Sequence, residues 1–272
     1  MKNEWTFRKE IICLAILLVL GGCMSVFKYE KEDNSRIKPE EFFYGKNLDM
    51  AKSIYQNDIS KVEKLIKEGI DINEVSEENT MTYLMYSVML DNRFEISELL
   101  LKYNADPNKV SKALSNSKKY EFYYLPLSYA SANKSIKYMS LLLKYGADPN
   151  KIYKNKAGRI ELDAMPAINS AVRSAYILNK WDRKDFMNDI KARIELLLEY
   201  GADVNSIGAM GKTVVEWAES NPEIVLYLMD KGADHHIYGK NLLRTSKRLL
   251  KATPNNSYRQ EIIRRLTALG YE

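Results

Sequence analysis

One five-residue phrase recurs along the chain and constrains the fold more than any other feature. It reads GIDIN at residues 69–73 and GADPN at residues 146–150. Three further copies are NADPN at 104–108, GADVN at 201–205 and the degenerate GADHH at 232–236. The last residues of successive copies lie 35, 42, 55 and 31 positions apart. The chain is therefore a series of related units of uneven length.

A leucine-rich stretch with the pattern of an amphipathic helix precedes each phrase, as at residues 99–101, 141–143 and 196–198. The glycine that opens the phrase is expected to end this helix in the left-handed conformation, which Asn104 also tolerates. The Asp and Asn that follow are expected to bond to the local backbone of the turn. Each unit is thus predicted to contain a helix with a tight C-terminal turn.

A second helix is predicted upstream of the leucine-rich one in each unit. Its clearest start is Pro126, because proline suits the first turn of a helix. The corresponding starts are residues 82–84, 165–167 and 213–215. Small residues at 130–132 allow the neighbouring helix to approach closely. Each unit is therefore predicted to be a pair of helices.

This pattern resembles the ankyrin repeat, which has a period of about 33 residues and the signature T-P-L-H. The likeness covers residues 47–272, although the histidine of the signature is replaced throughout. The residues in its place are Met85, Ser128, Ile168 and Glu216. The resemblance implies an all-α ankyrin-repeat solenoid of about five repeats. A polar-faced C-terminal cap is expected over residues 241–251 and 258–269. The resemblance also implies a protein-binding module that is monomeric when free and has no cavity for small substrates.

The first 22 residues have the organisation of a secretion signal. Lys2, Arg8 and Lys9 make a basic start, and residues 11–20 form an apolar run too short to span a membrane. The small pair before Cys23, ending at Gly22, then resembles the bacterial lipobox. That resemblance implies cleavage between Gly22 and Cys23 and attachment of acyl chains, such as palmitate, to Cys23. An ordinary secretory signal and an uncleaved anchor are the alternatives.

Residues 23–46 are predicted to be a lipidated cysteine and a polar tether. They lack helical or strand periodicity, and only residues 42–44 are candidates to dock on the first repeat. Several acyl chains give stable membrane anchoring. Met24 after the cysteine is typical of outer-membrane rather than inner-membrane sorting, so we expect a lipid-anchored protein of the cell envelope facing the periplasm. The only cysteines are Cys13 and Cys23, so no disulfide is expected in the repeats.

Two departures from the repeat are candidate partner-binding sites. The first is the aromatic segment before Pro126, which contains Tyr120, Phe122, Tyr123 and Tyr124. Tyr and Phe are enriched at interfaces, but Phe122 and one tyrosine could equally fill a gap in the core. The second is an extension between Pro166 and Gly201, which either lengthens both helices or forms a loop. Within it, Trp181 could anchor a partner or pack on Met187.

Catalytic chemistry finds little support. The only histidines, His235 and His236, are adjacent in the last phrase, and no thiol remains to ligate zinc. Gly211-Lys212-Thr213 lacks the upstream glycine of a phosphate loop. We therefore expect a non-enzyme without metal or cofactor.

The charge of the chain is only mildly basic. Residues 1–22 carry three basic and two acidic side chains, so the net charge of +5 falls to +4 for the rest. This mild excess does not call for nucleic acid. The basic side chains of the C-terminal cap are either a solvated face or a contact for anionic lipid or an acidic partner.

The pairing of ankyrin repeats with a lipobox is similar to immunity lipoproteins of type VI secretion systems. Those proteins sit in the periplasm and block lipase effectors by covering the active site. This likeness implies a lipase-type toxin as the protein partner. An envelope scaffold without a toxin partner is the alternative, and a periplasmic enzyme with an unrecognised site is a third reading.

Overall fold

The computed structural model describes residue 34 and residues 37–75, 81–114, 121–177 and 183–272. Residues 37–272 form one unit, which contains every element named below. The helices are η2 (Pro39–Glu41), α2 (Lys46–Gln56), α3 (Ile59–Lys67), α4 (Tyr83–Met89), α5 (Phe94–Lys102), α6 (Pro126–Asn133), α7 (Ile136–Lys144), α8 (Ala167–Ile177), α9 (Arg183–Glu199), η3 (Ala209–Gly211), α10 (Val214–Trp217), α11 (Pro222–Asp230), α12 (His235–Ala252) and α13 (Ser257–Ala268). The strands are β1 (Ser111–Leu114) and β2 (Glu121–Tyr124).

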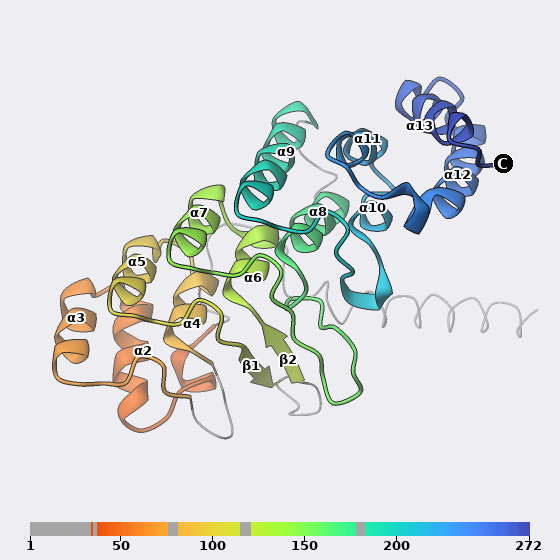
Figure 1. Ribbon diagram of the computed structural model, residues 1–272. Coiled ribbons are helices and arrows are strands. Elements are labelled where there is room, and N and C mark those ends of the chain that lie inside the picture. The colour runs from red at the N-terminus through yellow and green to blue at the C-terminus, as the bar shows by residue number, and fades with distance from the viewer. Residues whose placement is uncertain (1–33, 35–36, 76–80, 115–120, 178–182) are drawn as a thin grey trace, which may run out of the picture. The chain divides into compact units, whose positions relative to one another are not determined.

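The α-helices pair in chain order and the pairs stack in two rows (Figure 1). The first helices of the pairs, α2, α4, α6, α8, α10 and α12, form one row in which each contacts the next. The second helices, α3, α5, α7, α9, α11 and α13, form the other row. The predicted all-α solenoid is therefore confirmed. Among the described residues, five helix pairs are followed by α12 and α13 in the place of the expected cap.

Each second helix ends as the recurring phrase predicts. Gly146 has a φ of 87°, and Asn104 takes the same left-handed conformation with a φ of 68°. The amide of the next residue then reaches back to a carbonyl inside the helix, as in the bond from Ala147 N to Leu142 O at 3.0 Å. Such bonds satisfy carbonyls that a helix end leaves unpaired.

The asparagine at the end of the phrase joins consecutive repeats. Asn108 Nδ2 donates to Gly146 O at 2.8 Å, and its Oδ1 accepts from Asp148 N at 2.7 Å. Asn73 and Asn150 each make the same pair of bonds to the following copy of the phrase. The aspartates bond to the local backbone as expected, but the local role expected for asparagine is wrong. Its amide carries both a donor and an acceptor and therefore spans two turns.

A second set of bonds joins the repeats at the opposite ends of the first-row helices. Arg93 lies before α5, and its side chain donates to Ile54 O at 2.7 Å and Tyr55 O at 2.5 Å in the last turn of α2. Lys134 Nζ reaches Leu90 O, at the end of α4, in the same way at 3.2 Å. Arg193 donates to Ser131 O, and Arg259 to Glu219 O. A cation suits this position because the C-terminal end of a helix carries partial negative charge.

The C-terminal pair departs from the phrase. Asp234 caps α12, its side chain accepting from His236 N at 2.9 Å, so the helix begins at His235 rather than near Asn241. Both histidines therefore lie in the first turn of α12 and not in a loop. With His236 in the asparagine position, the described part of the chain shows no further bridging amide after Asn205.

Tyr271 locks the end of the chain onto α12. Its hydroxyl donates to His235 O at 2.9 Å, and a Cβ placed on Gly239 would lie 2.6 Å from its ring.

We expect Gly239→Ala to lower the free energy of unfolding by about 1–2 kcal/mol through overpacking, as measured by urea denaturation. In a Tyr271→Ala background the same change is expected to be neutral or stabilising, because alanine favours helix more than glycine does. Equal losses in both backgrounds would contradict the assignment of the clash.

Residues before α2 pack against the repeats. Phe43 is buried and stacks on Tyr83 with ring centroids 5.2 Å apart, while Phe42 contacts Tyr86. The Tyr86 hydroxyl donates to Ile37 O at 2.8 Å. Of the three residues that were candidates to dock, Phe42 and Phe43 do so and Tyr44 is exposed. The chain from Ile37 thus covers the face of α4 that carries its two tyrosines.

Candidate protein-binding surface

The connections that lead from one helix pair to the next differ in length, and three of them form the candidate surface. We call them fingers, the second running from α5 to α6, the third from α7 to α8 and the fourth from α9 to α10. All three extend to the same side of the helix rows, downward in Figure 1. The surface they make is separate from the second-row helices.

The second finger is a hairpin of β1 and β2 that holds the predicted aromatic segment. Phe122 and Tyr124 lie opposite Ala113 and Ser111, which are buried, so this face turns toward the core. Tyr124 packs edge to face on the fully buried Tyr129, with ring centroids 6.2 Å apart. Of the two residues in the core-filling alternative, Tyr124 therefore packs against the core, whereas Phe122 is half-buried and is not among the side chains packed on it.

Tyr123 lies on the other face of β2. Its hydroxyl donates to Glu121 Oε2 at 2.5 Å, and its ring stacks on Tyr153 of the third finger with centroids 4.3 Å apart and planes 25° from parallel. Desolvation, together with the hydrogen bond to Glu121, raises the pKa of the Tyr123 hydroxyl above its usual range. Both residues are half-buried and keep part of their surface exposed. They form a neutral, rigid aromatic pair at the surface.

The third finger is fastened to the second and to α8. Leu125 N donates to Asp163 O at 3.0 Å, beside a parallel bridge between Tyr124 and Asp163. The Asp163 carboxylate accepts from Arg173 of α8 at 2.9 Å. Burial raises the pKa of Asp163, and the arginine opposes that rise. These bonds hold Tyr153 against Tyr123 on a fixed framework.

The third finger was not among the candidate sites predicted from the sequence. A signal was present, because Gly146 and Pro166 are 20 positions apart whereas Gly201 and Thr213 are 12 apart. Spacing alone could have marked residues 151–165 as an extended finger. It could not have placed Tyr153 against Tyr123, since that contact depends on how two separate fingers pack.

The fourth finger exposes two apolar side chains. Ile207 is 50% exposed and Met210 is 72% exposed. Met210 also adopts a left-handed φ of 59°, which is uncommon for a residue with a side chain. Contiguous exposed apolar surface is characteristic of binding sites, and Ile207 and Met210 are three positions apart in this finger.

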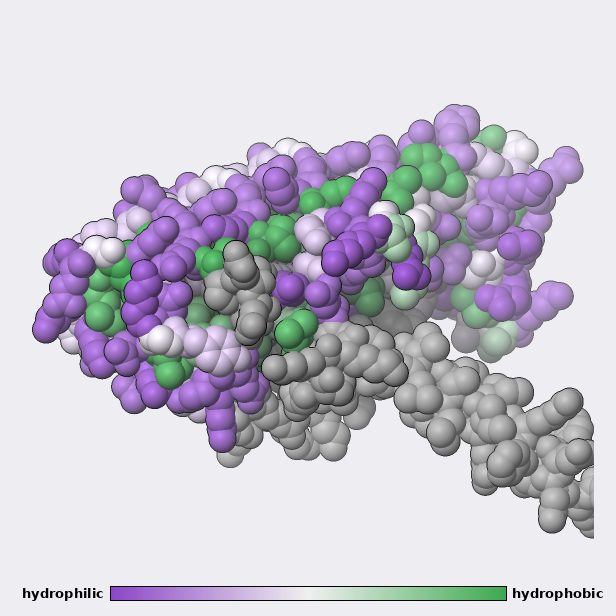
Figure 2. Space-filling model, turned by 90° about the horizontal axis from the view of Figure 1, so that it is seen from below, coloured by the Kyte–Doolittle hydropathy of each residue, from purple (hydrophilic) through white to green (hydrophobic). Residues whose placement is uncertain are grey.

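The side of the molecule toward which the fingers extend is largely hydrophilic. Figure 2 shows this side, with hydrophobic residues in several separate green patches among hydrophilic ones. Interfaces between proteins that also exist apart have this mixed character, with aromatic and apolar anchors inside a polar surround. The Tyr123–Tyr153 pair and Met210 are the described candidates for such anchors.

The remaining predicted site residues are only partly placed. Gly22, Cys23, Tyr120 and Trp181 lie outside the described residues, so lipidation and both aromatic contacts stay predictions. The extension in the fourth repeat lengthens both helices: α8 has 11 residues and α9 has 17, against 8 and 9 for α6 and α7. Met187 is buried and lies 3.1 Å from Asn221 Nδ2.

The described residues offer no metal site and no membrane span. Among them, no group of three or more His, Cys, Asp or Glu side chains is arranged to hold a metal ion. No described helix is both long enough and apolar enough to cross a bilayer. The histidine rings lie 4.2 Å apart, and His235 Nδ1 is 3.1 Å from the Tyr271 hydroxyl. The observed contacts of His235 are thus those of a packed C-terminal cap.

Stacked helix pairs joined by projecting fingers define a repeat solenoid. The family model for ankyrin repeats, in three copies, matches residues 48–153, which span α2 to the start of the third finger. These residues are therefore ankyrin repeats, and the pairs from α8 onward continue the same stacking. A comparison with curated proteins gave no match. Ankyrin repeats are typically non-enzymatic modules for protein–protein interaction, and residues 48–153 therefore indicate an interaction module.

Proposed function

We propose that the chain is a lipid-anchored protein of the bacterial envelope whose fingers bind a protein partner. The observation that supports the binding surface is the Tyr123–Tyr153 stack, because two separate fingers place it at the surface and Asp163 and Arg173 fix one of them. A rigid aromatic pair loses little entropy when a partner covers it. Tyrosine is also among the residues most often responsible for binding energy.

The anchoring half of the proposal rests on the N-terminal sequence. A basic start, a ten-residue apolar run, a small pair and Cys23 occur in the order and spacing of a lipoprotein signal. Growth with labelled palmitate tests it directly. Label is expected in the full chain and absent from Cys23→Ser, whereas label in both would overturn the assignment of the cysteine.

The finer proposal is that the partner is a lipase-type effector of a type VI secretion system and that this chain is the immunity protein against it. A tethered inhibitor would meet a membrane-attacking lipase where that enzyme acts. A strain lacking the gene is expected to lose viability beside effector-secreting siblings and to recover when the gene is restored. Normal growth under attack, with no second copy of the gene, would exclude immunity.

The binding surface has its own test. The full chain is used to capture partners from envelope extract, and the affinity of the captured protein is measured by calorimetry. We expect Tyr123→Ala combined with Tyr153→Ala to weaken binding by at least about tenfold, in line with interface aromatic residues. Tyr258→Ala, an exposed tyrosine on α13, is the matched control and should bind normally. Unchanged affinity in the double variant, with an unchanged melting curve, would move the site elsewhere.

The alternative is a scaffold that assembles host envelope proteins. The capture experiment distinguishes the two functions, since a scaffold would retain only host envelope proteins. Deletion of a scaffold gene would also have an effect without any attacker. The finger surface suits either partner. The two functions therefore share the palmitate and tyrosine tests and differ in the sibling-attack test.

A further inference from the structure

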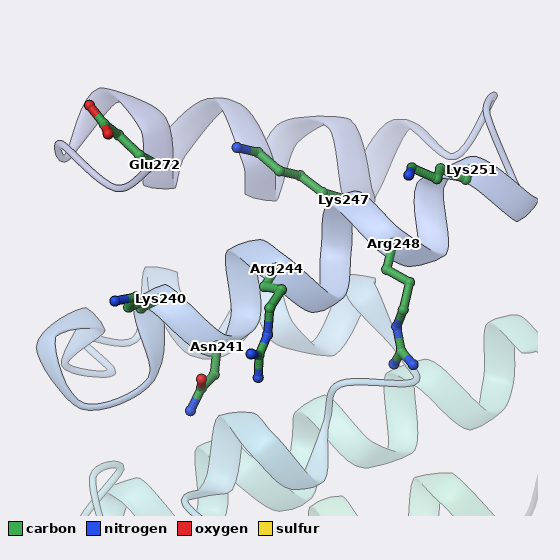
Figure 3. Close-up of a pocket in the computed structure, with 7 residues that line it drawn as sticks. All are labelled: Lys240, Asn241, Arg244, Lys247, Arg248, Lys251 and Glu272. Atoms are coloured by element: carbon green, nitrogen blue, oxygen red, sulfur yellow. The ribbon is translucent and has the colours of Figure 1, made fainter.

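The exposed face of α12 carries a row of basic side chains that none of the functions above uses. They line a hollow of about 370 Å³. Figure 3 shows these side chains on α12. The lining residues are Lys240, Asn241, Arg244, Lys247, Arg248, Lys251 and Glu272. All are exposed, and among the described residues none of the five cations is within ion-pair distance of a carboxylate.

The row follows from the helical repeat. Lys240, Arg244, Lys247 and Lys251 are three or four positions apart and so share one side of α12, while Tyr238 and Leu242 on the other side are buried. From Lys240 to Lys251 the helix rises roughly 16 Å at about 1.5 Å per residue. Among the described helices, α12 is the last of the first row.

Like charges held this close repel one another, since each cation lies within a Debye length of its neighbours. By contrast, Arg264 and Arg265 on α13 are paired with Glu261 at 2.7–2.8 Å. The chain thus neutralises cations on α13 and leaves those of α12 without described partners. An anionic surface would relieve this repulsion.

We propose that the basic face of α12 binds the surface of an anionic phospholipid bilayer. The residues that line it include no aromatic side chain on which a nucleic-acid base could stack. They also include no apolar side chain of the kind that an amphipathic helix inserts into a bilayer. Cys23 lies 14 residues before Ile37, so in an anchored chain Ile37 would stay within roughly 50 Å of the bilayer. The choice of a bilayer over an acidic protein rests on the proposed lipid anchor.

The test compares binding of the full chain, carrying Cys23→Ser, to two kinds of vesicle. One is pure phosphatidylcholine, and the other contains one part phosphatidylglycerol to two parts phosphatidylcholine. The apolar run at residues 11–20 can bind both, so the ratio of the two partition coefficients isolates the electrostatic contribution. Each basic residue at an anionic surface contributes roughly a fivefold preference.

We expect the triple variant Arg244→Gln, Lys247→Gln, Arg248→Gln to lose the anionic preference by on the order of a hundredfold. The matched control is Lys151→Gln, Lys156→Gln, Arg159→Gln, which removes the same charge from the third finger. It should keep the preference to within about twofold. High salt should abolish the preference of the parent chain.

Equal ratios for the triple variant and the parent would overturn the proposal. Binding of polyglutamate without any preference for phosphatidylglycerol would also overturn it and assign the face to an acidic protein. Both results are independent of lipid attachment, because the tested chain has no Cys23. Failure of the anchor would instead be seen in the palmitate experiment.

Discussion

Replacement of Arg93 by methionine is expected to lower the free energy of unfolding by about 2–4 kcal/mol. The guanidinium of Arg93 donates to Ile54 O and Tyr55 O of α2 and also to Asp91 O and Asn92 O of its own loop. Hydrogen bonds to charged groups are worth roughly 1.5–3 kcal/mol each, and loss of the arginine leaves partly buried carbonyls without a donor. Burial lowers the pKa of Arg93 without removing its charge at neutral pH.

Urea denaturation followed by circular dichroism measures this loss. Arg244→Met is the matched control, since that exposed arginine on α12 makes no such carbonyl contacts among the described residues, and its effect should stay within about 0.5 kcal/mol. Arg93→Lys should recover only part of the loss. A lysine ammonium lacks the forked donors of a guanidinium and so bonds to fewer of these carbonyls at once. A small and equal effect of both methionine variants would show that Arg93 does not join the first two repeats.

Replacement of Asn150 by alanine is expected to lower the free energy of unfolding by about 1–3 kcal/mol. The variant loses the bond from Asn150 Nδ2 to Gly201 O and the bond from Asp203 N to Asn150 Oδ1, both 2.8 Å long. Each net hydrogen bond contributes roughly 0.5–1.5 kcal/mol. The stability of a repeat stack depends on the coupling between neighbours, so the transition is also expected to broaden.

Asn205→Ala provides an internal comparison for this prediction. Asn205 Oδ1 accepts one bond from Asp234 N, at 2.7 Å, and among the described residues its Nδ2 donates no bond to the next turn. The loss in the same urea titration should therefore be about half of that for Asn150→Ala. Equal losses at the two positions, or none at Asn150, would contradict the bridging role of the asparagine.

The two predictions concern opposite ends of the first-row helices. Asparagine amides join the repeats on the finger side, and basic side chains join them at the helix C-termini. Neither set adds apolar area, yet both fix the rotation of one repeat relative to the next. The positions of Tyr123 and Tyr153 depend on this rotation, because the two rings belong to different fingers.

Much of the fold could be read from local patterns. The glycines and Asn104 that end the second helices, the starts at Pro126 and Thr213, and the leucine-rich faces act within a single turn or helix, so their effect does not depend on the rest of the chain. The same reasoning identified the repeats and the aromatic segment before Pro126. The N-terminal signal is also a local pattern, and its reading stays a prediction.

Only the tertiary structure showed which residues meet across repeats. Asn150 reaches Gly201, Arg93 reaches the end of α2, and Tyr153 stacks on Tyr123, although the sequence separates each pair by 30 or more positions. The faces of β2 were likewise assigned only by its pairing with β1, which turned Tyr124 inward and Tyr123 outward. The sequence by itself determined the repeating helix pair and its turns, because backbone sterics and helix periodicity act over a few residues. The register between repeats and the shape of the finger surface arise from packing between distant segments, which local preferences do not encode.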